Sequence, residues 1–261
     1  MSLCLTGVAL YTVIRYYKNV PGFYMNADSI VFKGNTVFFW KDLERIELAG
    51  KRPFKYMLSY AREGMMLKFK GSNEIYLFDD MYTSTATVKR FITCHVVKKT
   101  RDTESSIIGP KISDALQEQY IAYSGNQLLN YRGVLLWCML ALLLYGIIMN
   151  NNVIFTVFLL GLSGSCFLWL SAYMYSFGLS DNYLVVRNPN LFWIKKAYRL
   201  NDIKEVVFEQ QHSKLPYSLR IITADFESDL YMAGTLWNKK WVSLQKDLES
   251  KNIKVRNECI I

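Results

Sequence analysis

The residues that could do chemistry are few. The chain has two histidines, His95 and His212, and one adjacent pair of aspartates, Asp79-Asp80. His95 falls on the apolar face of an expected helix, which favours a packed imidazole, and His212 stands in an expected polar loop. Adjacent aspartates after a strand more often begin a turn than bind a metal. No nucleophile-elbow, zinc-protease, phosphate-loop or dinucleotide motif is present. We therefore expect no enzymatic activity, no metal and no cofactor.

The charge distribution points to a different chemistry, the binding of anions. The net charge of +9 divides into +6 over residues 15–132 and +3 over residues 178–261. A suitably placed Lys or Arg contributes about 1 kcal/mol at an anionic membrane surface. Candidates for contacts with lipid headgroups are Lys51, Arg52, Lys55, Lys195, Lys196 and Arg199. The alternative is a solvated basic face, or charge that only sets membrane topology. The aromatic residues alternate as in strands that face a core, so we expect no nucleic-acid binding.

A long apolar segment separates the two basic parts. Residues 134–149 and 153–177 carry no charge, and three asparagines separate them. A helix of about 20 apolar residues crosses the hydrocarbon of a bilayer. Residues 131–177 are therefore predicted to form a transmembrane helical hairpin, with helices over 133–149 and 153–175. The absence of ionisable residues in these helices disfavours a transporter.

Features inside and before this hairpin predict its packing and orientation. Gly161 and Ser165 would let the two helices approach closely. Residues 1–17 form a short N-terminal membrane segment, whose basic residues follow the apolar run, in the opposite order to a secretory signal. It could span, lie at the interface, or end a span that begins upstream. The basic residues after this segment and Arg132 before the hairpin place both soluble parts in the cytoplasm. Five cysteines without a paired pattern fit a reducing compartment.

The chain contains an internal repeat. Residues 25–32 match 178–185 at an offset of 153, and residues 40–46 match 200–206 at an offset of 160. Two later strands return to the offset of 153. The repeating unit is a membrane segment, then a β-rich domain, then a helix. The first copy lacks one membrane helix.

Each soluble copy is expected to be a set of short antiparallel strands closed by one helix. Turns such as Gly34-Asn35 separate the strands. In the second copy Thr235 caps a helix with one apolar face, formed by Trp237, Trp241, Leu244 and Leu248. The first copy has at the same places Ser84, Val88, Phe91 and His95.

The remaining residues are expected to be irregular. Residues 51–55 fall in a loop after the strand that follows Asp42. Residues 99–130 form a polar linker, interrupted by a turn at Gly109-Pro110, with a short helix over 113–123.

A seven-strand pattern, an Asp42-Leu43 or Asp202-Ile203 step and one amphipathic C-terminal helix resemble the pleckstrin-homology-like (PH-like) domains of bacterial membrane proteins. The resemblance is to small proteins in which a two-helix membrane hairpin directly precedes such a domain. It implies an α+β membrane protein with two PH-like antiparallel β-barrel or sandwich domains. The two domains cover residues 18–98 and 178–256, and each is closed by a C-terminal helix. The hairpin lies between the two domains. The family shares no catalytic residues that could be assigned here.

The function expected from these features is non-catalytic. A membrane-anchored interaction or scaffold protein would present PH-like domains at the cytoplasmic face of the bacterial inner membrane. Its partners would be membrane lipids and a protein at that face. The alternatives are an immunity-type membrane protein that neutralises a toxin, or an accessory subunit of a membrane enzyme or transporter.

Overall fold

The computed structural model describes residues 11, 13–14, 20–55, 59–98, 117–149, 152–212 and 215–259. The chain divides into two compact units. Unit 1 comprises Met1–Ser106 with Asp225–Glu227, and unit 2 comprises Ile107–Ala224 with Ser228–Ile261. Most of the expected N-terminal membrane segment 1–17 and of the linker, including the turn at Gly109-Pro110, lies outside the described residues.

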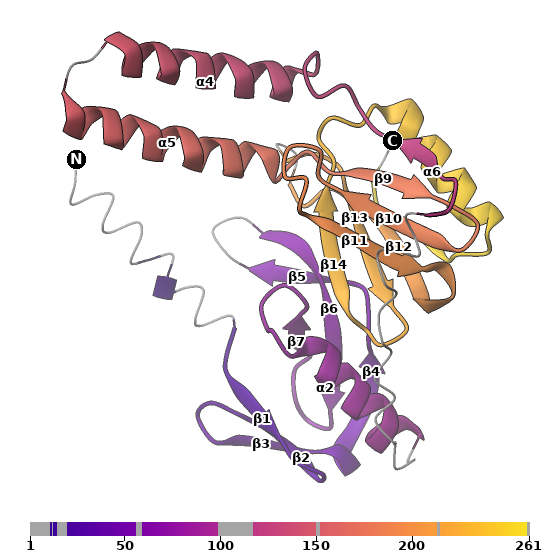
Figure 1. Cartoon of the computed structure of the whole chain (residues 1–261). Helices are drawn as coiled ribbons and strands as arrows, with labels where there is room; N and C mark the ends of the chain where they lie inside the picture. Colours follow the sequence, from indigo (N-terminus) through magenta and orange to yellow (C-terminus); the bar gives the residue numbers. More distant parts are fainter. Residues whose placement is uncertain are drawn as a thin grey trace. The chain divides into compact units, whose positions relative to one another are not determined.

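Unit 1 has two antiparallel sheets followed by a helical segment (Figure 1). One sheet has the order β1-β2-β3, and the other has the order β4-β6-β5 with β7 also paired to β6. The strands are β1 (Phe23–Met25), β2 (Ser29–Phe32), β3 (Thr36–Phe39), β4 (Leu43–Glu47), β5 (Lys51–Lys55), β6 (Ser59–Phe69) and β7 (Ile75–Phe78). The helical parts are the short turn η1 (Trp40–Asp42), α2 (Thr85–Phe91) and the wider turns of η2 (Ile92–Lys98).

Unit 2 has the same plan with a membrane-type hairpin inserted after its first strand (Figure 1). Its sheets have the orders β11-β10-β9-β8 and β14-β13-β12-β15. The strands are β8 (Ile121–Tyr123), β9 (Ser176–Leu179), β10 (Tyr183–Arg187), β11 (Lys195–Arg199), β12 (Ile203–Glu209), β13 (Ser218–Thr223), β14 (Ser228–Met232) and β15 (Val255–Asn257). The helices are α4 (Tyr131–Met149), α5 (Val153–Ser171), the short turn η3 (Leu200–Asp202) and α6 (Asn238–Ser250).

The apolar hairpin is confirmed, with shifted ends. Asparagine side chains cap both helices: Asn130 accepts the amide of Arg132 at 3.1 Å, and Asn152 accepts the amides at the start of α5. Helix α4 therefore begins before Gly133 and includes Arg132. Helix α5 ends at Ser171, four residues earlier than expected, because the next residues pair with the end of β14.

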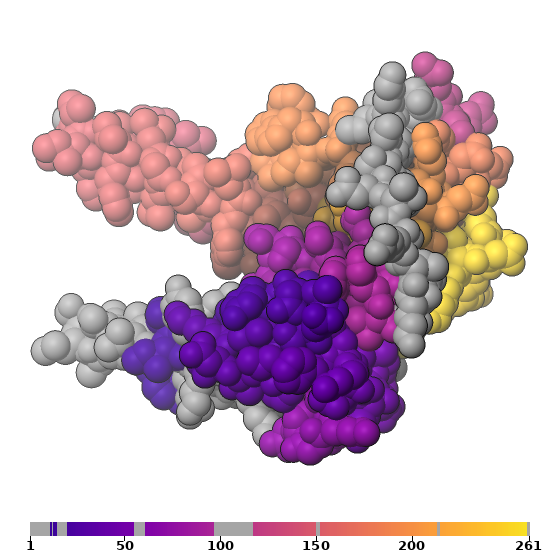
Figure 2. Space-filling view, turned by 90° about the horizontal axis from the view of Figure 1, so that it is seen from below, coloured from indigo at the N-terminus to yellow at the C-terminus, as the bar shows by residue number. Residues whose placement is uncertain are grey.

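Both helices are long and apolar enough to cross a membrane and are little covered by protein. Figure 2 shows the hairpin, in salmon, extending from the rest of unit 2. At its base, α4 packs on the end of α5 through Leu136, Leu170 and Met174. Gly161 and Ser165 do not serve this contact: both are exposed, and no atom lies within 4 Å of where a Gly161 side chain would begin. Gly146 of α4 faces α5 instead: a side-chain carbon added to it would lie 3.3 Å from Leu159.

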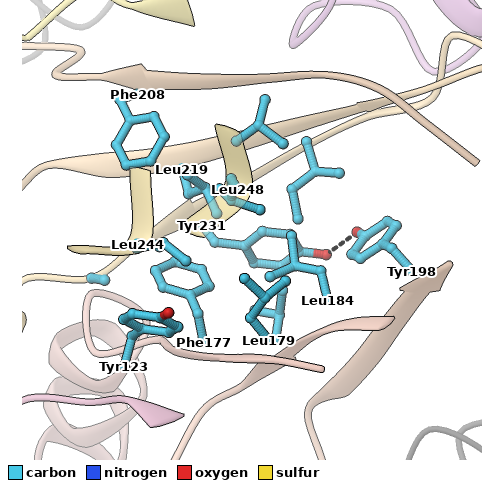
Figure 3. Close-up of a cluster of buried hydrophobic side chains, with 14 of the residues drawn as sticks. Tyr123, Phe177, Leu179, Leu184, Tyr198, Phe208, Leu219, Tyr231, Leu244 and Leu248 are labelled. Carbon is cyan, nitrogen blue, oxygen red and sulfur yellow. Dashed lines mark hydrogen bonds between the residues drawn. The ribbon is translucent and has the colours of Figure 1, made fainter. Parts of the chain in front are cut away.

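The core of unit 2 lies between its two sheets and α6 (Figure 3). Leu184 and Val186 of one sheet meet Val206, Phe208 and other side chains of the second sheet. The core also contains three residues from α6, Trp241, Leu244 and Leu248. These three were expected on the buried face. Trp237 was expected beside them, but it is exposed and occupies the N-cap position of α6, which was expected for Thr235.

The core of unit 1 has the same plan with a shorter helix. Ile30, Met65 and Leu67 are fully buried between the sheets, and Val88 and Ile92 cover them. His95 is exposed and stacks on Phe91 with ring centroids 4.4 Å apart, so its expected place on the buried face is wrong. The helix widens after Phe91, which moves His95 off the face that Val88 defines.

Strand registers relate the two units residue by residue. Ser29 lies opposite Phe39, and Tyr183 opposite Arg199, so β10 follows β2 by 154 positions and β11 follows β3 by 160. The pairings of β4 with β6 and of β12 with β13 keep the same two offsets. These registers fit the expected repeat with an offset of 154, one residue more than the expected 153. In a strand, an error of one residue assigns every side chain to the opposite face of the sheet.

A shared irregularity supports the same alignment. The register shifts between Leu43 and Arg45 in β4, and between Ile203 and Glu205 in β12. These positions are equivalent at the offset of 160. A β-bulge bends its strand, so both copies bend at the same point, immediately after the short turns η1 and η3.

Several expected elements differ from the structure. Within the described residues the four sheets are open, and none closes into a barrel. Residues 51–55 form the edge strand β5, not a loop, and Pro53 is tolerated there because an edge strand needs fewer amide donors. Residues 121–123 form β8, which pairs with β9, where the sequence favoured a short helix.

A buried ion pair lies in the described part of each unit. In unit 1, Lys89 lies 2.7 Å from Asp79, and both side chains are almost fully buried. In unit 2, Arg220 Nε lies 3.0 Å from Glu209, again with both side chains about 1% exposed, and Ser228 accepts a second bond from Arg220. The two pairs occupy unrelated positions of the repeat.

We expect Arg220→Met to destabilise unit 2 by about 3–5 kcal/mol, because it leaves the Glu209 carboxylate buried without its cation. The double variant Glu209→Met/Arg220→Met should recover most of this loss, since it removes both charges. Unfolding of the purified chain in mild detergent measures both. Equal destabilisation by the single and double variants would contradict the buried ion pair between Arg220 and Glu209.

Candidate functional site

The candidate site is the end of unit 2 where the hairpin meets the sheets. The loop between β10 and β11, residues 188–194, is tied to the end of α5. Asn188 Nδ2 donates to the carbonyl of Ser171 at 2.7 Å, and Asn190 Nδ2 donates to the Ser171 hydroxyl at 3.2 Å. Asn188 is buried, and its Oδ1 accepts amides of the loop itself. The loop is therefore held at the level at which the apolar helix stops.

Aromatic and aliphatic side chains are exposed at this same end. Phe192 is 71% exposed and Trp193 61% exposed, at the tip of the tied loop, and their rings meet edge to face at 4.9 Å. Exposed side chains that accompany them near the ends of α4, α5 and the start of α6 are Leu128, Leu129, Tyr131, Trp169 and Trp237. Amphipathic rings of this kind favour the headgroup region of a bilayer.

The three candidate lipid contacts on β11 do not share one face. Lys196 lies on the same side as the buried Tyr198, and its Nζ is 2.6 Å from Asp229, so its charge is already paired. Lys195 lines a cavity of about 370 Å³ next to the tied loop. Arg199 is exposed at the far end of the strand, opposite Tyr183.

The candidates in unit 1 lie on the edge strand β5. Arg52 forms an ion pair with Glu47, and the hydrogen bond from Arg52 is the main reason why the pKa of Glu47 is lowered. Lys51 is opposite Glu63 in the β5–β6 register. Lys55 ends the strand, and its side chain lies outside the described part of the chain. Of the six candidates, Arg52 and Lys196 are thus engaged with carboxylates.

A cluster of phenols closes one end of the unit 2 core (Figure 3). The hydroxyls of Tyr198 and Tyr231 are 2.5 Å apart, and Tyr198 also donates to Asp229 at 2.8 Å. Burial is the main cause that raises the pKa of both phenols, and the neighbouring Asp229 carboxylate raises them further. Both side chains are therefore protonated at neutral pH, which suits a structural bond and not a general base.

The residues that seemed able to do chemistry are not brought together. Asp79 is neutralised by Lys89, and His95 is exposed. His212 lies in the turn after β12, where its carbonyl accepts the amide of Leu215. In the described ranges no three His, Cys, Asp or Glu side chains gather as metal ligands would.

A second polar cavity of about 320 Å³ lies at the start of α4. Arg132, in the first turn of the helix, lines it together with Gln210 and Tyr217. The guanidinium of Arg132 lies 5.1 Å from the ring centroid of Tyr131. This places a cation at the base of the first apolar helix.

Sequence reasoning missed Arg187 and the tie between the loop and α5. By its composition, Asn188-Pro-Asn190 predicts a short turn followed by a strand from Leu191. The loop instead continues to Ile194, so Arg187 pairs with Lys195. The two asparagines were a usable signal, because Asn side chains commonly bond backbone near turns. Their partner, Ser171, could be found only from the fold.

Comparison with protein-family models and with curated proteins gave no match. The class that the fold itself defines is a mixed α+β protein with several antiparallel sheets and a long hairpin of two apolar helices.

We expect Asn188→Ala to release the loop from α5 and to destabilise unit 2 by about 1–3 kcal/mol, because the substitution leaves buried backbone groups unpaired. Trp193 should then become less accessible to quenchers placed in the lipid. Asn182→Ala, at an exposed amide bonded to Glu118, is the matched control and should change neither measurement. An unchanged Trp193 depth in Asn188→Ala would contradict the role of the tie.

Proposed function

We propose that this protein is a non-catalytic, membrane-anchored scaffold. Its hairpin spans the bacterial inner membrane, and two PH-like domains at the cytoplasmic face bind a protein partner and contact anionic lipid. The observation that carries this proposal is the direct junction in unit 2: an uncovered apolar hairpin ends where exposed aromatic and basic residues of the β-domain begin.

The PH-like assignment is supported by the plan that both units share. Each unit has two sheets with a core between them, and a helix follows β7 in unit 1 and β14 in unit 2. The strand pairs are antiparallel except that β15, after the helix of unit 2, pairs in parallel with β12. The equivalent registers and bulges fit a duplication of one such domain. Because the sheets are open, they favour a β-sandwich over a β-barrel, the two alternatives expected from the sequence.

A binding role without catalysis fits the chemistry of the ionisable groups. Buried charges are paired in Lys89–Asp79 and Arg220–Glu209, and the buried phenols Tyr198 and Tyr231 stay protonated. These groups stabilise the sandwich. Loops and sheet edges remain as binding surfaces, and two such domains on one chain raise the effective concentration for a partner that contacts both.

Topology can be measured by labelling of single cysteines in a chain whose own five cysteines are replaced. With impermeant maleimide on intact cells, Asn73→Cys and Lys239→Cys should stay unlabelled until the membrane is opened, because both exposed positions belong to the soluble units. Met149→Cys, at the far end of α4, is the control and should react from outside. The reverse pattern would contradict the orientation.

The scaffold role can be measured by affinity purification from membranes. A protein partner should be recovered with the wild type and also with Lys195→Glu/Lys196→Glu/Arg199→Glu, if the partner recognises the fold and not the basic strand. Loss of all protein and lipid retention from both forms would contradict the interaction role altogether.

A further inference from the structure

The cavity beside the tied loop of unit 2 has an unusual lining. It measures about 370 Å³, within the range of small-ligand sites. Tyr120, Gly178, Arg187, Phe192 and Lys195 are among its lining residues, and no Asp or Glu is. It lies on the face of the β8–β11 sheet opposite the core, because Arg187 and Lys195 alternate with the core residues Val186 and Tyr198.

Two cations lie side by side in the lining of this cavity. Arg187 and Lys195 are directly opposite in the β10–β11 register. Like charges at such a pair destabilise a sheet. The neighbouring pair has no such conflict, because Lys196 lies opposite Val186 and its charge is paired with Asp229. An anion between Arg187 and Lys195 would turn the repulsion into two attractive contacts.

The side chain of Arg187 is held in one orientation and has a donor that is free to bind such a ligand. Its guanidinium stacks on the ring of Tyr120, 4.5 Å from the ring centroid, which fixes its orientation. Its Nε is buried and has no hydrogen-bond partner among the described residues. A buried donor without a partner is costly, and a phosphate oxygen is the acceptor that a guanidinium binds most strongly.

The position of the cavity indicates the source of the anion. Asn188, next to Arg187, bonds the last residue of α5, so the cavity opens near the end of the apolar helix. Phe192 lines the cavity and is largely exposed beside Trp193. A charged recess with exposed aromatic rings at its rim suits an amphiphile, which has a phosphate and a glycerol-linked acyl chain.

We propose that Arg187 and Lys195 form a binding site for the phosphate of an anionic phospholipid, with Phe192 against the glycerol and the start of an acyl chain. A zwitterionic headgroup is disfavoured because its choline brings a third cation to the two already present. This site deepens the proposed function and rests on it, since it requires the hairpin to lie in the bilayer.

The test uses the purified full chain in detergent with short-chain phosphatidylglycerol, and binding is followed by native mass spectrometry. Two cations, each contributing about 1 kcal/mol, correspond to a weakening of about 30-fold in Arg187→Gln/Lys195→Gln. Arg199→Gln removes the same charge from the same strand outside the cavity and should bind as the wild type does. Equal binding by the double variant and the wild type overturns the proposal.

A second variant separates binding from folding. Lys195→Glu creates an opposite-charge pair with Arg187, so the lipid-free protein should melt at a higher temperature while phosphatidylglycerol binding is lost. A purely structural role for Lys195 predicts the opposite sign of the melting shift. Retained lipid binding in Lys195→Glu would also overturn the site.

Two further arms identify the ligand. Inorganic phosphate should bind far more weakly than phosphatidylglycerol, because it makes no contact with Phe192, and phosphatidylcholine should not compete. If phosphate binds as tightly as the lipid, the site serves a soluble anion and the lipid assignment fails. A separate experiment measures sedimentation of the chain with membranes. A chain that does not sediment contradicts the proposed function. A chain that sediments but shows no lipid selectivity contradicts only this site.

Discussion

The apolar surface of the α4–α5 hairpin is the constraint on which the rest of unit 2 depends. Two helices of 19 residues each leave most of their large side chains uncovered by protein. Exposure of apolar surface to water costs roughly 25 cal/mol per Å², and the proposed insertion of the hairpin into a bilayer removes this cost. In that proposed arrangement, the features next to the helix ends lie near the boundary between lipid and water. This proposed boundary would explain three features together: the exposed rings of Phe192 and Trp193, the cation of Arg132, and the cavity lined by Arg187 and Lys195.

The polar contacts of unit 2 divide into two groups. Those inside the sandwich are complete pairs, such as Arg220 with Glu209 and the phenols of Tyr198 and Tyr231. Those at the hairpin end leave cations facing cavities, as Arg132 and Arg187 do. The first group stabilises the fold with its charges already neutralised. The second group keeps its charge available to molecules outside the chain.

Much of the fold could be predicted from the sequence because its patterns are local. Charge-free runs predict the hairpin, and the strand from Tyr183 to Arg187 and the buried face of α6 follow from alternation and helical spacing. The offset of 153 is one residue too short because weakly similar strands can be slid without changing their composition. Only the hydrogen-bond register gives the offset of 154 between β2 and β10, whereas the bulges at Leu43 and Ile203 keep the offset of 160.

The candidate site was harder to predict because it depends on contacts distant in sequence. Lys195, Lys196 and Arg199 were grouped by proximity along the chain, but strand alternation sends Lys196 to the opposite face, towards Asp229. The cavity needs Tyr120, which precedes the hairpin, and Arg187, which follows it. Short strands such as β8 and β15, with three residues each, carry too little pattern to be recognised.

The tie between Ser171 and the β10–β11 loop has a mechanical consequence. Four residues separate the end of α5 from β9, and Asn188 and Asn190 make a second attachment to the same helix end. A single flexible connection would let the two sheets of unit 2 move independently of α5. With both the chain segment and the asparagine bonds attached to the end of α5, the sheets should move together with the helix. Helices tilt when bilayer thickness changes, so a thinner or thicker bilayer would rotate the whole sandwich and change the angle at which its sheets meet the membrane surface.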